Sequence, residues 1–391
     1  MKLAHVLLLL PAILYVTITI SWQQQGVNQI TGDEPHYLLT ADSILRDGDL
    51  LVVNNHQIDT PVLRCMPPKS RFGDDTHSLN GYSIHGLGLP LLLLPAYALG
   101  GVLGAKIWLA GLLGLIPISV YRRARALLPG SHWPLPIALL VGLSPPFLIG
   151  SNQLYPDLLA GLIIFTLLGG WGERRGSWRA LGVGLLLALL PWLHLKFLLP
   201  ALLLGALYAL PPAPSFRPRL AAAVPLIVSV IGLGVYHQVA FGSPFGPYQA
   251  GDAAGSLPQV LMVALGLHLD RMQGLFFQAP LLLLGVVGLA AWLAESRRLA
   301  LAGGAIYLAL LLPSAAHTNW YGGASFAGRF FWALALLWVL PLLALLRRLR
   351  GPGQLAAVIG ALLLACALEG IFLAKVLIPN SYTYTAPLHP T

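Results

Sequence analysis

Long apolar runs recur along this chain, and most of them approach the length of a membrane-crossing helix. A helix needs about 20 apolar residues to cross the hydrocarbon core of a bilayer. Only 9% of the residues are charged and 57% are hydrophobic, whereas an ordinary soluble domain carries about 25% charged residues. Because so few polar groups cannot cover a water-exposed surface, the sequence predicts an all-α polytopic membrane protein and excludes a soluble enzyme.

The positive charge is concentrated in short clusters between the apolar runs. These clusters lie at 122–125, 174–179, 217–219, 297–298 and 347–350. Cytoplasmic loops of membrane proteins are enriched in Lys and Arg, so we place all of them in the cytoplasm together with Lys2. The net charge of +9 then reports the topology of a multi-pass protein in a bacterial inner membrane, and no nucleic-acid partner is expected.

This alternation predicts about eleven membrane crossings within a single domain over 1–391. The expected spans are 3–20, 104–121, 135–150, 157–172, 178–193, 197–212, 220–240, 275–294, 299–314, 330–346 and 355–376. The run 84–101 is apolar enough to cross, but counting it would invert every later loop. We therefore expect it to be an interfacial or re-entrant piece of a long first periplasmic loop, 21–103.

Two adjacent carboxylates, Asp33 and Glu34, follow the first crossing directly. Thr31 and Glu34 have the spacing of a capping box, and Pro35 suits the first helical turn, which predicts an amphipathic helix on the membrane surface that ends near Gly48. A carboxylate here could act as a general base toward an acceptor hydroxyl. The alternative is that Glu34 is only the capping partner and Asp33 only complements the helix dipole.

The segment from Thr31 to Leu50, TGDEPHYLLTADSILRDGDL, resembles the first periplasmic loop of the GT-C glycosyltransferase superfamily. It is most similar to bacterial relatives of the protein O-mannosyltransferases and to the aminoarabinose transferases. The stretches 144–157, 241–245, 274–280 and 319–329 also resemble family segments, in the same order. The resemblance implies a sugar donor carried on a polyprenyl phosphate, with Asp33 as the catalytic base and Glu34 beside it.

Two predicted outer turns carry further polar residues for a substrate site. Asp157 lies where a helix enters the membrane, so its carboxylate needs a partner; it could orient the acceptor or cap the helix. His194 and Lys196 occupy a turn in an almost uncharged stretch. An ammonium there suits a lipid phosphate, and the alternative is that Lys196 snorkels to lipid head groups.

The later loops add four more candidates for substrate binding. Arg329 opens a crossing after a Gly-rich loop, and its guanidinium suits phosphate; the alternative is an interface anchor. Arg271 could bind substrate or pair with Asp270 beside it. His317 could contact the donor, and Tyr321 could stack on a sugar, although an aromatic belt at the membrane boundary explains such rings as well.

A cofactor is not specified by the sequence. The two cysteines, Cys65 and Cys366, form no CxxC pattern. A divalent cation such as Mg²⁺ or Mn²⁺ is left open, because carboxylates and scattered histidines could hold it.

The predicted function is inverting transfer of a sugar from a polyprenyl-phosphate carrier to a periplasmic lipid, glycan or protein acceptor. A transporter or flippase of lipid-linked sugars is the alternative, and a non-catalytic assembly partner is a third reading. Transporters tend to place charges at mid-membrane, whereas the polar residues here gather in the predicted outer loops.

Overall fold

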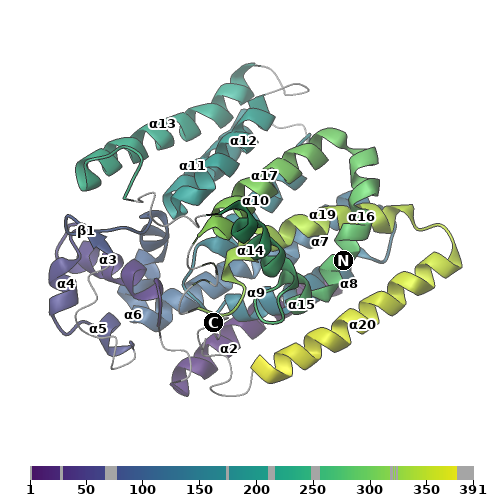
Figure 1. Ribbon diagram of the computed structural model, residues 1–391, viewed down its shortest axis with the longest axis horizontal. Coiled ribbons are helices and arrows are strands. Elements are labelled where there is room, and N and C mark those ends of the chain that lie inside the picture. The colour runs from purple at the N-terminus through teal and green to yellow at the C-terminus, as the bar shows by residue number, and fades with distance from the viewer. Residues whose placement is uncertain are drawn as a thin grey trace.

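The computed structural model describes residues 2–26, 30–66, 77–172, 176–209, 216–247, 256–317, 320, 322 and 325–376. These residues form a helical protein (Figure 1), as the sequence predicts. The only sheet in the described part is a two-stranded hairpin, β1 (Ser78–Leu79) and β2 (Tyr82–Ser83). Its turn residues Asn80 and Gly81 both have positive φ, which is the conformation that an Asn-Gly hairpin turn requires.

The remaining elements follow in chain order. They are α1 (Lys2–Leu7), α2 (Leu10–Gln24), α3 (Glu34–Arg46), α4 (Val53–Gln57), α5 (Pro61–Arg64), α6 (Gly88–Leu113), α7 (Leu115–Leu127), α8 (Pro134–Leu143), α9 (Pro145–Gly150), α10 (Asp157–Gly169), α11 (Ser177–Leu193), η2 (Leu195–Phe197), α12 (Leu198–Ala209), α13 (Phe216–Phe241), α14 (Leu257–Leu269), α15 (Leu275–Gln278), η4 (Pro280–Leu282), α16 (Leu283–Glu295), α17 (Arg297–Ala316), η5 (Arg329–Phe331), α18 (Trp332–Ala335), η6 (Leu336–Trp338), α19 (Val339–Arg348) and α20 (Pro352–Val376).

The count of eleven crossings is wrong for the described helices. Six helical segments are long and apolar enough to cross a membrane: Leu3–Gln24, Gly88–Leu127, Phe216–Phe241, Arg297–Ala316, Arg329–Arg348 and Pro352–Lys375. The other apolar helices have 10–17 residues. Proline explains part of the difference, because Pro145 and Pro146 begin a new helix within the predicted span 135–150 and divide it into α8 and α9.

The run 84–101 is helical over most of its length. It forms the first half of α6, which continues through α7 as one apolar segment of 40 residues. The backbone breaks at Gly101, where φ is 58° and ψ is −147°; glycine tolerates this conformation and other residues do not. The predicted interfacial piece and the predicted span 104–121 therefore belong to one apolar helical segment that is kinked at Gly101.

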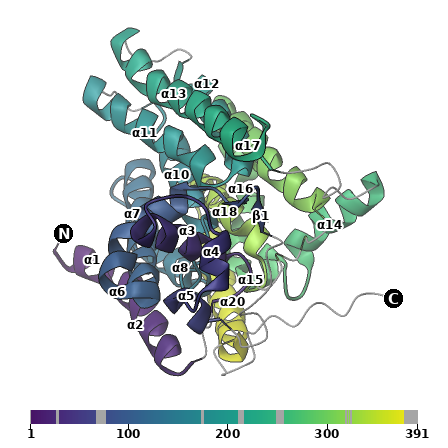
Figure 2. The same cartoon turned by 90° about the vertical axis from the view of Figure 1, so that its left-hand side faces the viewer.

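Helix α3 confirms the predicted helix but not its predicted surface position. Every residue from Glu34 to Ser43 is buried, because α4, α5, α6 and the β-hairpin surround it (Figure 2). The Tyr97 hydroxyl donates a hydrogen bond of 2.7 Å to Asp42, which also forms an ion pair of 2.9 Å with Arg46. The described part of the first loop thus packs around α3, and α3 is not an isolated amphipathic helix on the surface.

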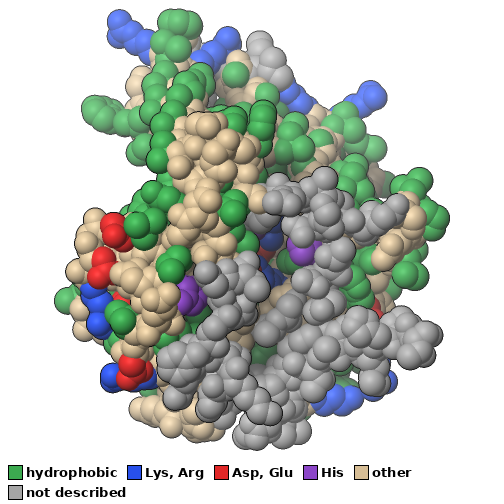
Figure 3. Space-filling view, turned by 60° about the vertical axis from the view of Figure 1, so that its left-hand side comes forward, with side chains coloured by type: hydrophobic (Ala, Val, Ile, Leu, Met, Phe, Trp, Pro, Cys, Tyr) green, Lys and Arg blue, Asp and Glu red, His purple; other side chains and the backbone are tan. Residues whose placement is uncertain are grey.

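Apolar side chains cover the outside of the bundle. They are prominent on three helices: Val228, Ile231 and Val239 of α13, Leu261, Met262 and Leu265 of α14, and Leu363, Leu364 and Ile371 of α20. Figure 3 shows hydrophobic side chains over much of the upper part of one face, with acidic side chains at its left margin. Extended apolar surface of this kind fits a lipid environment.

Three of the basic clusters, 122–125, 297–298 and 347–350, lie together at the end of the bundle where α10 ends. Arg298 is stacked 5.0 Å over the ring of Trp171, just beyond the end of α10. Arg348 pairs with Glu295 at 3.3 Å where α19 and α16 end. The opposite end of α10 begins at Asp157, and a helix of this length spans about 20 Å. The positive clusters are therefore separated from Asp157, as the charge pattern predicts.

Candidate active site

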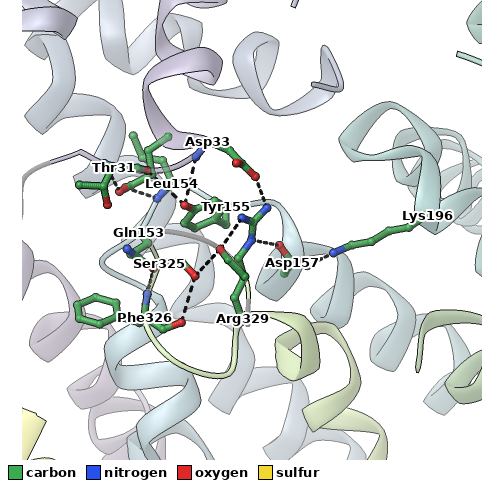
Figure 4. A network of polar contacts seen from close by, with 12 residues as sticks. Thr31, Asp33, Gln153, Leu154, Tyr155, Asp157, Lys196, Ser325, Phe326 and Arg329 are labelled. Atoms are coloured by element: carbon green, nitrogen blue, oxygen red, sulfur yellow. Dashed lines mark hydrogen bonds and ion pairs between the residues drawn. The ribbon is translucent and has the colours of Figure 1, made fainter. Parts of the chain in front are cut away.

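Five segments that are far apart in sequence meet at the end of the bundle opposite the basic clusters. They are the start of α3, the turn 151–156, the start of α10, the short helix η2, and the loop that leads into η5 (Figure 4). Four of the predicted site residues, Asp33, Asp157, Lys196 and Arg329, come together here.

These four side chains form a chain of alternating charge. The Arg329 guanidinium pairs with Asp33 through Nη2 and approaches Asp157 Oδ2 with Nε at 3.6 Å. The Lys196 ammonium pairs with the other oxygen of Asp157. Two cations and two carboxylates thus balance, which is how buried charges are tolerated.

Asp33 is the carboxylate of this chain that reaches solvent. Its side chain is 20% exposed, whereas that of Asp157 is 1% exposed. Burial acts to raise the pKa of Asp33, but the charge of Arg329, with smaller contributions from His85 and His77, holds the pKa well below its usual value. Asp33 is therefore ionised and held by Arg329 in this state.

Glu34 has a different environment from its neighbour. Its side chain is fully buried; one oxygen accepts the backbone N–H of Leu154 at 2.8 Å, and the other accepts that of Thr31 at 3.2 Å. The Lys106 ammonium lies 3.8 Å away and is also fully buried. The bond from Thr31 is the one that the capping-box alternative predicts, so Glu34 joins α3 to the turn 151–156 and presents no open oxygen to a substrate.

Arg329 is held in place from several directions. Its guanidinium stacks 3.8 Å over the Tyr155 ring, and Nη1 donates to the Gly322 carbonyl at 3.4 Å. The preceding Gly328 has a φ of +86°, and a β-carbon there would collide with the Phe331 ring. Glycine is therefore required at the position that turns the chain into η5.

Glutamine side chains fix the loop before Arg329. Gln153 Oε1 accepts the Phe326 N–H at 2.9 Å, and Gln273 Oε1 accepts the Gly328 N–H at 2.5 Å. Gln278 donates to the Ala327 carbonyl at 2.8 Å. Three side-chain amides thus hold the backbone just before Arg329 and so fix the position of its side chain. A precise site needs support of this kind.

His194 positions Lys196 rather than meeting the carboxylates itself. Its Nδ1 accepts the backbone N–H of Lys196 at 3.2 Å and so caps η2. Burial, and then the neighbouring Lys196 charge, lower the pKa of His194 well below its usual value, so the ring is neutral and can accept. The Lys196 ammonium also lies 5.2 Å and 5.3 Å from the ring centres of Phe197 and Phe330.

The other three predicted substrate residues have different outcomes. Arg271 is exposed and is not part of the chain of charges among the described residues, so its role in substrate binding stays a prediction. Asp270 instead accepts the N–H groups of Met272 and Gln273. His317 lies at the edge of the site, with its ring 5.8 Å from that of Phe330. Tyr321 lies outside the described residues.

Sequence analysis missed several residues that the fold brings to this end. Lys106 is the only Lys or Arg in the apolar run 84–121; a charge in such a run is by itself a signal for function or pairing. Tyr155 lies under the guanidinium of Arg329. Three histidines, His36, His77 and His85, form a cluster beside Asp33, and their separation in sequence concealed it.

An apolar pocket opens beside His85. It is lined by Ile84, His85, Gly86, Leu87, Pro191, Leu195, Leu233, Tyr236, His237, Phe241 and Pro247. Figure 3 shows Lys or Arg and His side chains in a recess at the centre of one face. His85, which lines this pocket, also interacts electrostatically with Asp33 of the chain of charges.

Comparison of this chain with protein-family models, with curated proteins and with solved structures finds no match. The resemblance of residues 31–50 to the GT-C superfamily therefore stays an expectation, and so do the roles that it implies.

The Tyr155 ring should stabilise the site more than its hydroxyl does. Tyr155→Phe loses two hydrogen bonds of 3.3 Å, to Asp33 and Thr31, and should cost about 0.5–1.5 kcal/mol. Tyr155→Leu also removes the stacking on Arg329, which adds about 0.5–2 kcal/mol. Denaturant unfolding in detergent measures both. Equal losses in the free energy of unfolding for Tyr155→Phe and Tyr155→Leu would show that the stacking on Arg329 does not stabilise the protein.

Proposed function

We propose that this protein is an inverting glycosyltransferase that takes a sugar from a polyprenyl-phosphate carrier, with Asp33 as the general base. The observation that carries the proposal is the convergence of a solvent-reaching carboxylate, Asp33, with two cations, Arg329 and Lys196, at the end of the bundle away from the basic clusters. A base and an anion-binding pair in contact are what transfer from a phosphate-linked donor needs.

The two cations suit the phosphate of the donor. Arg329 and Lys196 are both engaged by Asp157, which holds them on one side of the turn 151–156. An arriving phosphate would compete with the carboxylates for their N–H groups, and Arg329 can serve both because guanidinium has five donors.

Donor binding would also activate the base. Arg329 is the main group that depresses the pKa of Asp33, so sharing its charge with a phosphate raises that pKa. Asp33 then takes the proton of the acceptor hydroxyl, and the acceptor oxygen forms a bond to the anomeric carbon. The bond from that carbon to the phosphate oxygen breaks, the configuration inverts, and Arg329 and Lys196 stabilise the departing polyprenyl phosphate.

The position of the charges favours an enzyme over a transporter. Transporters bind substrates near the bilayer midplane between broken helices. Here Asp33, Asp157 and Arg329 lie at the starts of α3, α10 and η5. The chain of charges therefore lies at helix ends, where an aqueous acceptor can reach it.

The direct test is a transfer assay with the full chain in detergent. Radiolabelled polyprenyl-phosphate sugars are offered with a panel of lipid, glycan and protein acceptors, and label moved to an acceptor is measured. We expect wild-type protein to transfer label and to release polyprenyl phosphate. Movement of the intact donor across proteoliposomes without transfer would instead support the flippase alternative.

Lys196 should act mainly in donor binding. A hydrogen bond to a charged group is worth about 1.5–3 kcal/mol, so Lys196→Gln should weaken donor binding about 10- to 100-fold. Lys196→Arg should lose less, because it keeps the charge. The exposed Arg271, which lies outside the network, gives the control Arg271→Gln. Donor KM and direct binding of polyprenyl phosphate are the measurements, and equal effects of the Lys196 and Arg271 variants would contradict the role.

A further inference from the structure

A cluster of histidines lies beside Asp33 and plays no part in the chain of charges. His36 is in the first turns of α3, His77 precedes strand β1, and His85 follows strand β2. Their nearest ring nitrogens all lie within 4.8 Å of one another. The ring centres are 4.2 Å apart for His36 and His77, and 5.4 Å apart for each of the other two pairs.

The fold presents these rings on ordered elements. The hairpin turn pairs Ser78 with Ser83, and the Ile84 N–H donates to the His77 carbonyl at 2.9 Å, which brings His77 next to His85. His36 is 5% exposed and lies one helical turn after Asp33, on the same face of α3. The cluster is therefore built from a helix and a hairpin, and not from loose loop tips.

The polar atoms of His85 have no satisfying partner in the described part of the chain. His85 is 8% exposed, and both of its ring nitrogens are buried without a hydrogen bond. A buried polar group left unpaired costs about 1–3 kcal/mol, so such a group in a native protein points to a water or an ion that satisfies it. One nitrogen of His85 is directed into the cluster with His36 and His77.

We propose that His36, His77 and His85 bind one divalent transition-metal ion, with Zn²⁺ as the preferred metal. Imidazole ligands suit Zn²⁺ and its neighbours, whereas Mg²⁺ and Mn²⁺ prefer oxygen. Three protein ligands leave a fourth position of the tetrahedron open, as in catalytic zinc sites. Tetrahedral Zn²⁺ holds its nitrogens about 3.3 Å apart. The three rings are stacked at 18–27° to one another, so binding requires the rings to turn until one nitrogen of each faces the ion.

The position of the site suggests what the ion would meet. Asp33 interacts electrostatically with both His85 and His77, and His85 also lines the apolar pocket. The open position would therefore face the same space as Arg329 and Asp33, where a water or a substrate oxygen can reach it. The proposal rests on the histidine geometry and does not depend on glycosyl transfer.

Metal binding by the full chain tests the proposal. The protein is purified in detergent through a tag without histidine, stripped with a chelator, and titrated with Zn²⁺ by calorimetry. The expected result is one Zn²⁺ per chain and, with Co²⁺, the intense visible bands of a tetrahedral site. Mutation of outer-shell partners alone lowers metal affinity about 10- to 100-fold, so His85→Ala and His77→Ala should weaken binding by at least about 100-fold. The exposed His132 gives the matched control, His132→Ala, which should bind as wild type does.

Several outcomes would overturn the site. These are uptake of less than one Zn²⁺ per chain by the wild type, tight binding that survives in both variants, and Mn²⁺ binding that equals Zn²⁺ binding. A Zn²⁺-dependent rise in the unfolding midpoint of the wild type gives a readout that needs no variant, and its absence would also contradict the site. A chain that binds Zn²⁺ but transfers no sugar would refute the proposed function and leave the metal site standing.

Discussion

Replacing Asp33 by Asn should lower turnover by about 10²- to 10⁴-fold, the usual contribution of a general base. Asparagine keeps the shape of the side chain but cannot take a proton from the acceptor. Donor affinity should hold or rise, because Arg329 is released from its pair with Asp33. The fold should persist, since Arg329 keeps its contacts with Asp157, Gly322 and the Tyr155 ring.

The matched control for this variant is Asp59→Asn. Asp59 also pairs with an arginine, Arg64, at 2.8 Å, but both side chains are 64% exposed, and surface pairs of this kind contribute little. Turnover with saturating donor is measured for both variants, together with the unfolding midpoint. Turnover of Asp33→Asn within a few-fold of wild type would remove Asp33 from the role of base. A large loss of turnover in Asp59→Asn as well would show that the assay responds to a general disturbance of the fold and not to loss of the base.

The buried pair of Glu34 and Lys106 should carry the largest stability effect. Glu34→Gln leaves a buried ammonium facing a neutral amide, and the new NH₂ group faces a backbone N–H that formerly had an acceptor. Removal of one partner of a buried ion pair costs about 3–5 kcal/mol. We expect a loss of this size in the free energy of unfolding, whatever the protein does.

A double-mutant cycle separates the pair from its surroundings. Lys106→Met keeps the length of the side chain and removes the charge, and the double variant leaves neither charge of this pair in place. The double variant should be more stable than the sum of the single losses predicts, with a coupling of about 0.5–3 kcal/mol. Urea unfolding in a fixed detergent measures all four proteins. Strict additivity would mean that the 3.8 Å approach carries no energy.

The helical class and the grouping of charge could be predicted because each depends on local sequence. Apolar runs without charges favour buried or lipid-facing helices wherever they occur. Thr31, Glu34 and Pro35 predicted the start of α3, and Gly48, with a φ of +73°, marked its end. The convergence of Asp33, Asp157, Lys196 and Arg329 was also anticipated, because charges in an apolar protein must find partners.

The errors have physical reasons. Counting apolar runs gave eleven spans, because hydropathy does not register where Pro145 interrupts a helix or that several apolar runs form helices of only 10–17 residues. Helix α3 was predicted to lie on the surface because its partners are distant in sequence; Tyr97, for example, lies 55 positions from Asp42.

The sequence by itself determined that this chain is an all-helical protein suited to a bilayer, with basic clusters between its apolar runs. The tertiary structure alone decided what each carboxylate does. Asp33 and Glu34 are adjacent in sequence but lie in different environments. Asp33 reaches solvent and pairs with Arg329, whereas Glu34 is enclosed by Leu154, Thr31 and Lys106. The reason is that successive residues of a helix point in directions about 100° apart, so the surrounding segments, and not the local sequence, set the environment of each.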